Sequence, residues 1–443
     1  MSPLPALGGA LPPLRPGLRV PRHRATTRNL VALYPWVAEA GLGGAGVQMG
    51  LNVTAGNDAF HFDPFQLYTD DHLQGPNMVV CGMVGCGKSA TLKAFLWRSV
   101  GMFGSPPAGG PRWVAIFDPK GEYGPLAEAL GLDVVRLCPG GGCRVNPLDR
   151  GPGDSRTAGD LARLRTDLVL AMAGHVLPRP LQPIEDAAVG YCIDLLTREE
   201  HAEPTLLDLT AMLGDPPASV AARAGLRHDD LVDRLADIRL SLGKLLDRNL
   251  RGMFDGRSTV TPNWNGRGIV IDLSAVFHDR DALPLVMLAA TSWLQALYSP
   301  TGIDGPRRYQ VLDEAWAVLG TERTARFVQS TWKLSRHYGI VNIAVVHRIS
   351  DLRSQSDDGT AAAKVAEGLL ADSQTRVVFR QSSDQVDDAT RLLGLTPVEA
   401  EMLPQLVRGR ALWKIGGYSA VVQHVLEDHE RQLCRTDHRL ALS

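Results

Sequence analysis

Cysteine is scarce in this chain. Six cysteines are scattered over 443 residues, which excludes a disulfide-stabilised fold and indicates reduced thiols. Cys138 and Cys143 flank a run of glycines, but they lack the two-residue spacing and the second pair that a structural zinc site requires. The sequence therefore predicts neither a disulfide framework nor a zinc site.

Long apolar runs and a strong net charge are also lacking. The most apolar helical segment, 282–298, is shorter than the roughly 20 residues that span a bilayer, and it contains Pro284, so we expect a buried helix. The arginines near the start have no apolar core between them, which argues against a secretory signal. The net charge of −2 gives no support for DNA as a partner, although a local basic groove remains compatible with DNA.

What is present is an alternation of short apolar strands with helices. A helix is expected over 88–102, and a second one ends at Gly131. Between about 154 and 250, apolar residues recur every three or four positions, which predicts helices only. Strand–helix alternation on both sides of that segment predicts an α/β fold with a mostly parallel sheet. Strands are expected within 46–53, 59–65, 77–83, 112–118, 132–140, 267–276, 307–314, 339–347 and 374–381, and a hairpin within 410–426.

The stretch GMVGCGKS at 82–89 fits the pattern G-x-x-x-x-G-K-[ST] between an expected strand and an expected helix. Glycines let consecutive backbone N–H groups surround phosphates, and the helix N-terminus adds partial positive charge. Lys88 is expected to reach the β- and γ-phosphates of ATP, and the Ser89 hydroxyl to ligate Mg²⁺. The residues predicted to bind nucleotide in this loop are Gly82, Met83, Val84, Gly85, Cys86, Gly87, Lys88, Ser89 and Ala90.

Two carboxylates follow another expected strand. Asp313 and Glu314 end the apolar run of YQVLDEAW. Hydrolysis of a nucleotide needs one carboxylate that holds Mg²⁺ and another that polarises the attacking water. We assign Asp313 to the metal and Glu314 to the water.

Two further strand ends carry polar residues. The segment FDPKGEY places Asp118, Lys120 and Glu122 at the end of the strand that we expect beside the phosphate loop, where ligands bind in open α/β sheets. His347 ends the segment IAVVH and is a candidate sensor of the γ-phosphate. These residues complete the predicted nucleotide site.

Together, GMVGCGKS, FDPKGEY, VNPLD, LDEAW and SRHYGIVNIAVVHRIS resemble the motifs of conjugation and type IV secretion motor ATPases, the VirB/TraC-type proteins of the HerA–FtsK superfamily. The similarity extends from about Gly46 to the C-terminus. It implies a RecA-like P-loop ATPase domain with an inserted all-α domain and a C-terminal β-hairpin. Residues 1–26 are rich in Pro, Gly and Arg, which predicts a disordered tail or, alternatively, an arm that touches anionic lipid, nucleic acid or a partner protein. The other segments are the first ATPase part at 27–150, the helical insertion at 151–260 and the second ATPase part at 261–443.

The resemblance also implies Mg²⁺-dependent ATP hydrolysis in hexameric rings, with an arginine supplied by the neighbouring subunit. Arg336, Arg376 and Arg380 are the candidates for this arginine, and the sequence does not choose among them. The superfamily usually has glutamine where His347 stands. Its large N-terminal domain has no counterpart before the phosphate loop, so we expect a separate protein to supply it, or residues 1–26 to replace part of it.

Three functions remain open at this point. The resemblance favours a cytoplasmic motor, peripheral at the inner face of the cell membrane, that contacts inner-membrane secretion-complex proteins and energises assembly or substrate transfer. A DNA-translocating motor, like the coupling proteins or FtsK and HerA, is the first alternative. The second is a nucleotide-gated assembly scaffold with little turnover.

Overall fold

The computed structural model describes residues 41–103, 111–151, 156–198, 203–298, 306–347 and 361–434. Contacts along the chain divide it into two units, Met1–Gly41 and Leu42–Ser443, and the fold lies in the second. The tail predicted at 1–26 lies outside the described residues. In the part of the chain that the structure describes, no helix is both long enough and apolar enough to cross a membrane.

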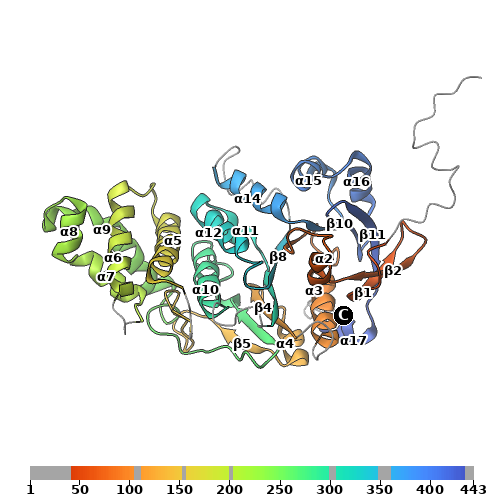
Figure 1. The fold of residues 1–443 in the computed structure, drawn as a ribbon, viewed down its shortest axis with the longest axis horizontal. Coiled ribbons are helices and arrows are strands. Elements are labelled where there is room, and N and C mark those ends of the chain that lie inside the picture. Colours follow the sequence, from red (N-terminus) through yellow and green to blue (C-terminus); the bar gives the residue numbers. More distant parts are fainter. Residues whose placement is uncertain are drawn as a thin grey trace, which may run out of the picture. The chain divides into compact units, whose positions relative to one another are not determined.

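A sheet with helices packed around it organises the second unit (Figure 1). It has eleven strands in the order β2-β1-β11-β10-β9-β3-β8-β7-β4-β6-β5. The strands from β9 to β5 pair in parallel, whereas β2, β1, β11 and β10 pair antiparallel. The predicted mostly parallel α/β sheet and the predicted hairpin are therefore confirmed. The strands are β1 Val47–Asn52, β2 Asp58–Phe62, β3 Met78–Cys81, β4 Arg112–Asp118, β5 Asp133–Arg136, β6 Gly268–Asp272, β7 Arg307–Leu312, β8 Ile340–Val346, β9 Thr375–Val378, β10 Arg410–Ile415 and β11 Tyr418–His424.

Helices bury both faces of the sheet, as continuous apolar runs such as β3 require. Val79 and Cys81 of β3 belong to one hydrophobic cluster, while Met78 and Val80 belong to the other. The helices outside the segment between β5 and β6 are α2 Pro64–Thr69, α3 Lys88–Met102, α4 Gly124–Leu130, α10 Ala282–Tyr298, α11 Trp316–Leu319, α12 Glu322–Lys333, α14 Ala361–Asp372, α15 Val386–Leu393, α16 Pro397–Met402 and α17 Asp428–Leu433.

Several of these elements match the sequence prediction closely, because their signals are local. Helix α3 has the predicted bounds, and α4 ends at Gly131, whose φ of 67° suits glycine. Thr396 and Glu399 form the capping box of α16 with Pro397 at its first position. Helix α10 is buried along almost its whole length, as expected.

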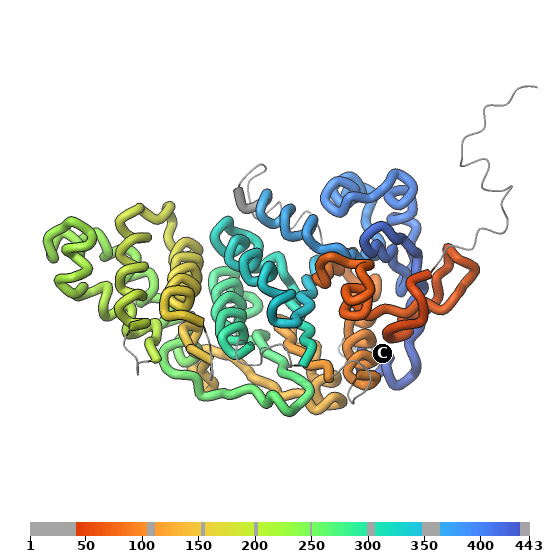
Figure 2. The backbone as a smooth tube through the Cα atoms, in the orientation of Figure 1, coloured from red at the N-terminus to blue at the C-terminus, as the bar shows by residue number. Residues whose placement is uncertain are grey.

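The segment between β5 and β6 is helical. It contains α5 Ala158–Val176, α6 Pro183–Arg198, α7 Leu206–Gly214, α8 Ala218–Ala224 and α9 His228–Lys244, followed by a π-helical turn at Leu245–Asn249. Helices α6 to α9 lie at the end of the second unit away from the β10–β11 hairpin (Figure 2). The boundaries of a separate domain at 151 and 260 stay a prediction.

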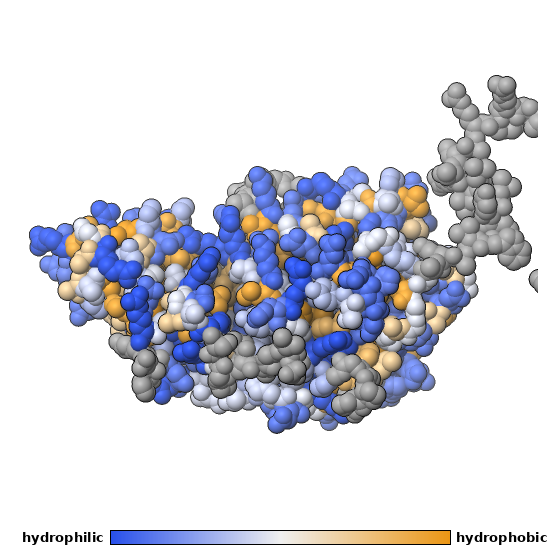
Figure 3. Space-filling model, in the orientation of Figure 1, coloured by the Kyte–Doolittle hydropathy of each residue, from blue (hydrophilic) through white to orange (hydrophobic). Residues whose placement is uncertain are grey.

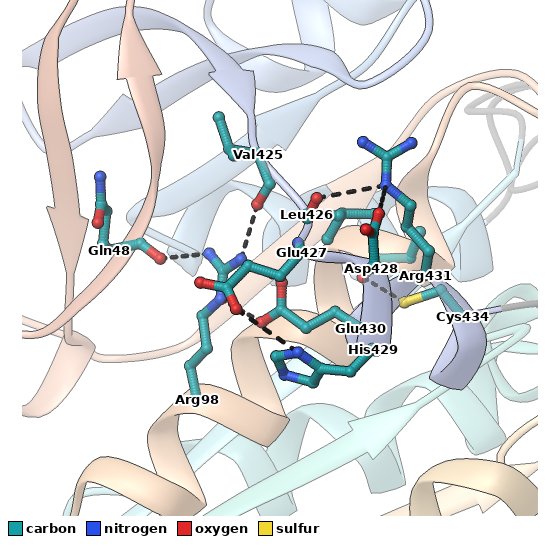
Figure 4. Close-up of polar contacts among 11 residues, drawn as sticks. Gln48, Arg98, Val425, Leu426, Glu427, Asp428, His429, Glu430, Arg431 and Cys434 are labelled. Atoms are coloured by element: carbon teal, nitrogen blue, oxygen red, sulfur yellow. Dashed lines mark hydrogen bonds and ion pairs between the residues drawn. The ribbon is translucent and has the colours of Figure 1, made fainter.

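Segments from the two ends of the described chain lie side by side at the antiparallel edge of the sheet. Strand β1 pairs with β11, so that Gly50 lies opposite His424. Figure 4 shows how Arg98 of α3 joins this region to α17: its guanidinium donates to both carboxylate oxygens of Glu430 and to the backbone oxygens of Gln48 and Val425. The phosphate-loop helix and the C-terminal helix are thereby tied together.

Apolar side chains are scattered in small groups, among mostly hydrophilic residues, on the face of the molecule seen in Figure 3. This pattern agrees with a core that lies between the sheet and its helices. The prediction that the FDPKGEY strand is adjacent to the phosphate-loop strand was wrong. Strands β8 and β7 lie between β3 and β4, and pairing between distant segments leaves no mark on local sequence.

Candidate nucleotide site

The phosphate loop connects β3 to α3 and depends on its glycines. Gly82, Gly85 and Gly87 have φ angles of 148°, 77° and 109°, a region that other residues rarely adopt. A Cβ atom on Gly82 would lie 2.5 Å from the Cβ atom of Phe379. Helix α3 starts at Lys88 without a side-chain cap, so its first backbone N–H groups are suited to bind an anion.

Lys88 is a buried cation surrounded by backbone oxygens. Its Nζ atom donates to the carbonyl oxygens of Gly82, at 2.5 Å, and Met83, at 2.8 Å. Burial lowers the pKa of Lys88. Within the described ranges the side chain makes no ion pair. A buried ammonium group beside a glycine loop and an uncapped helix N-terminus fits a phosphate anion.

The loop is braced from the antiparallel side of the sheet. Its Met83 N–H donates to the Arg380 carbonyl at 3.0 Å, and its Cys86 carbonyl accepts from the Gly409 N–H at 2.9 Å. Phe379 packs against Gly82, and the His424 ring stacks on Phe379 with centroids 5.5 Å apart. Sequence reasoning assigned no role to Phe379, Gly409 or His424. Phe379 and Gly409 contact the loop from about 300 residues further along the chain, and His424 acts through Phe379.

Asp313 and Glu314 follow β7 and are both buried. Burial and the charge of Glu314 raise the pKa of Asp313 to about 6. Burial alone would also raise the pKa of Glu314, but its contacts with His347 and Lys120 lower it to about 2. Trp316 Nε1 donates to Glu314 Oε2, a contact that the quoted motif LDEAW contains but that sequence reasoning did not assign.

Lys120 and His347 reach the same carboxylate although they follow different strands. Lys120 Nζ forms an ion pair with Glu314 Oε1, and His347 Nε2 lies 2.6 Å from that oxygen. Asp118 positions the Lys120 loop, because its two carboxylate oxygens accept from the N–H groups of Glu122 at 3.0 Å and Tyr123 at 2.9 Å. Asp118 is thus held by its own loop, and Glu122 contributes a carbonyl oxygen to buried Lys93.

The donor set at this edge of the sheet fits a divalent cation. Asp313, Glu314 and His347 each offer a ligand atom within 4.8 Å of the others. The carboxylate oxygens of Asp313 and Glu314 are ligands that suit Mg²⁺, whereas His347 offers a ring nitrogen. Ser89 lies in the first turn of α3, beside Lys88. Asp313 and Lys88 are close enough for the Asp313 charge to raise the pKa of the lysine against the larger effect of burial.

The three candidate arginines have different surroundings. Arg376 donates to the carbonyl oxygens of Ser373, Leu393 and Ala371 in its own chain. Arg380 is exposed directly after Phe379. Arg336 is exposed and donates weakly, at 3.4 Å, to the Gln74 carbonyl. Two of the predicted loop residues differ in their surroundings. Val84 is 77% exposed, whereas the Ala90 carbonyl accepts a hydrogen bond from the Cys434 thiol.

A phosphate loop on β3, an acidic pair after β7 and a parallel sheet in the order β9-β3-β8-β7-β4 define a P-loop NTPase fold. Known structures agree. VirB4 of Thermoanaerobacter pseudethanolicus superimposes with a TM-score of 0.67 at 20% identity, over 89% of this chain and all of that chain. The plasmid coupling protein TrwB in complex with ADP and Mg²⁺ gives a TM-score of 0.51 at 18% identity, over 79% of this chain and 86% of TrwB.

Sequence comparison points the same way. The type IV secretion system protein CagE of Helicobacter pylori (strain ATCC 700392 / 26695) is 24% identical over 201 residues, which cover 45% of this chain and 19% of CagE. This chain therefore matches about a fifth of the length of that curated relative. No protein-family model matches the chain. The resemblance to VirB/TraC-type secretion ATPases inferred from the motifs is thus confirmed, and the fold is that of the RecA-like VirB4 ATPase domain.

Proposed function

We propose that this chain is a Mg²⁺-dependent ATPase that works as a hexameric ring in a type IV secretion apparatus. The observation that carries the proposal is the meeting of Lys120, Glu314 and His347 at the same sheet edge as the phosphate loop. Likeness to VirB4 and CagE supports the secretion context. The partners in this apparatus are inner-membrane secretion-complex proteins.

The roles follow from the chemistry of each side chain. Lys88 and the N–H groups of the loop bind the phosphates of ATP, and Ser89 and Asp313 hold Mg²⁺. When bound, Mg²⁺ neutralises charge that develops on the phosphates. Glu314 accepts a proton from the attacking water, and His347 fixes the carboxylate by donating to it. Arg336 or Arg380 reaches the neighbouring subunit's nucleotide, since Arg376 is engaged within its own chain.

The test is the ATPase rate per subunit as a function of protein concentration, with light-scattering mass measured on the same samples. If an arginine acts between subunits, the rate should rise as rings form, because such an arginine contributes about three to five orders of magnitude in related enzymes. DNA should leave the rate unchanged. A rate that is independent of assembly would contradict the shared site.

The TrwB-like fold supports one alternative, a DNA-translocating motor. Strong stimulation of the assembled ring by duplex DNA would favour this alternative over the secretion motor. A rate that stays very low in assembled rings would instead favour the nucleotide-gated scaffold. The same experiment therefore separates all three functions.

A further inference from the structure

Three side-chain atoms from three strand ends meet at one point beside the phosphate loop. They are Nζ of Lys120, which follows β4, Nε2 of His347, which follows β8, and Oε1 of Glu314, which follows β7. The two nitrogens lie 2.9 Å apart, His347 Nε2 lies 2.6 Å from Glu314 Oε1, and Lys120 is in direct ion-pair contact with the same oxygen. Each atom therefore touches both of the others.

These three contacts cannot all be hydrogen bonds. His347 Nε2 either donates or accepts, and an Nε2 that accepted from Lys120 would place two acceptors 2.6 Å apart. Among the described residues, His347 Nδ1 has no hydrogen-bond partner, so the ring proton that finds an acceptor is the one on Nε2. Lys120 and His347 are then two donors that share one acceptor oxygen.

Glu314 is the fixed member of this group and Lys120 the mobile one. The Glu314 backbone has a φ of 54°, its Oε2 atom accepts from Trp316, and its side chain is 3% exposed. Lys120 is held through the end of a long flexible side chain that is 27% exposed. A competing anion would therefore displace Lys120 before it displaced Glu314.

The phosphate loop brings such an anion to this point. Lys88 and Lys120 are near enough to repel each other electrostatically, and a loop lysine of this kind reaches the β- and γ-phosphates. The terminal phosphate of a nucleoside triphosphate would relieve this repulsion. A nucleoside diphosphate lacks the terminal phosphate, so it places less negative charge near Lys120.

We propose that Lys120 senses the terminal phosphate of the bound nucleotide by leaving the Glu314 carboxylate for that phosphate. The exchange makes Lys120 a determinant of selectivity for triphosphate over diphosphate, and it frees a lone pair of Glu314 Oε1 for water. It rests on the proposed function only in taking a nucleotide as the ligand.

Nucleotide affinity tests the exchange without turnover. We would measure binding of ADP and of a non-hydrolysable ATP analogue to full-length wild-type protein, Lys120→Met, Lys120→Arg and the exposed control Lys333→Met. Loss of one charge-assisted hydrogen bond should weaken analogue binding to Lys120→Met by about tenfold and ADP binding by less than about twofold. Lys120→Arg should keep most of the preference, and Lys333→Met all of it.

Trp316 provides a second readout, because it donates to the carboxylate that Lys120 would release. The difference in fluorescence between wild type and Trp316→Phe isolates its signal. The analogue, but not ADP, should change this signal in wild type, and Lys120→Met should show the changed signal before nucleotide is added.

The outcomes separate this proposal from the function on which it rests. Equal losses of affinity for ADP and the analogue, or a Trp316 signal that ignores the analogue in wild type, would overturn the exchange and leave the ATPase intact. Absence of nucleotide binding in wild-type protein would overturn both.

Discussion

At the scale of single residues, Glu314 combines its proposed catalytic role with a strained backbone. Its φ of 54° is rare for a residue with a side chain, and such conformations cost about 1–3 kcal/mol and cluster at functional sites. Contacts with Trp316, His347 and Lys120 fix the side chain. The carboxylate is thus held in one orientation without a bound substrate.

Glu314→Gln should nearly abolish hydrolysis and preserve nucleotide binding. Glutamine keeps the size of the side chain and its bond from Trp316 but cannot accept a proton from water. Loss of a general base slows turnover by about 10² to 10⁴. Steady-state hydrolysis and equilibrium binding check the two parts, with Glu128→Gln, at an exposed position of α4, as the matched control. Hydrolysis at the wild-type rate would remove Glu314 from the mechanism.

At the scale of elements, charged and polar side chains join segments that lie far apart in the sequence. Asp63 caps α2 through the Phe65 N–H and forms a buried ion pair with Arg112 of β4, at 2.8 Å. The rings of Phe65 and Phe103 lie against the same guanidinium group. Strand β4 is thereby tied to the segment that follows β2.

Asp63→Asn should lower the free energy of unfolding by about 3–5 kcal/mol, because it leaves the buried charge of Arg112 facing a neutral amide. Asparagine remains a good helix cap, so the cap itself should contribute little to the loss. Urea unfolding measures the change. Exposed Asp58→Asn, on β2, should change the free energy by less than about 0.5 kcal/mol. Equal effects of the two substitutions would show that the ion pair adds nothing.

His424 makes the hairpin and the phosphate-loop brace sensitive to acid. Trp413 donates to His424 Nε2, so Nδ1 carries the proton and donates to the Gly409 carbonyl. Burial, with a smaller effect of the Arg98 charge, lowers the pKa of His424 from 6.5 to about 4. The unfolded chain therefore takes up the proton first, and stability is full above pH 6.5 and falls as the pH drops towards 4.

This shift corresponds to a loss of about 2 kcal/mol in the free energy of unfolding between pH 7.5 and pH 5. Urea unfolding at both values should show that loss in wild type and a smaller one in His424→Gln. The exposed histidine variant His429→Gln serves as the control and should behave as wild type. An unchanged pH dependence in His424→Gln would assign the acid sensitivity to other groups.

How much the sequence predicted depended on the range of each interaction. The bounds of α3, the capping box of α16 and the residues at the strand ends follow from local patterns and were confirmed. The strand order could not be derived from local patterns. The sequence prediction placed β4 beside β3, which was wrong, and it did not foresee the pairing of β1 with β11. The positive φ of Glu314 and its bond from Trp316 arise only in the folded chain.

At the scale of the whole molecule, a shared site between subunits can be detected by mixing two inactive variants. Lys88→Ala should lose nucleotide binding, and Arg336→Ala or Arg380→Ala should lose hydrolysis. In an equal mixture, about a quarter of the interfaces would combine an intact loop with an intact arginine, and activity should return to that extent.

The mixture is measured as ATPase rate after subunit exchange, and Arg234→Ala on α9 serves as an arginine control that should be active alone. The arginine whose variant recovers activity with Lys88→Ala is the one that acts between subunits. If neither pair recovers activity in rings of normal mass, the arginine does not act in trans.

The position of β3 in the sheet also determines when the protein can fold during its synthesis. Its two neighbours, β8 and β9, are more than 250 residues further along the chain. A ribosome adds about 5–20 residues per second, so β3 waits roughly 10 to 50 s for a partner. Unpaired apolar strands of this kind aggregate readily. In the cell the nascent chain should therefore need a chaperone until β8 and β9 emerge. Bound ATP can stabilise the fold only after these strands have paired with β3.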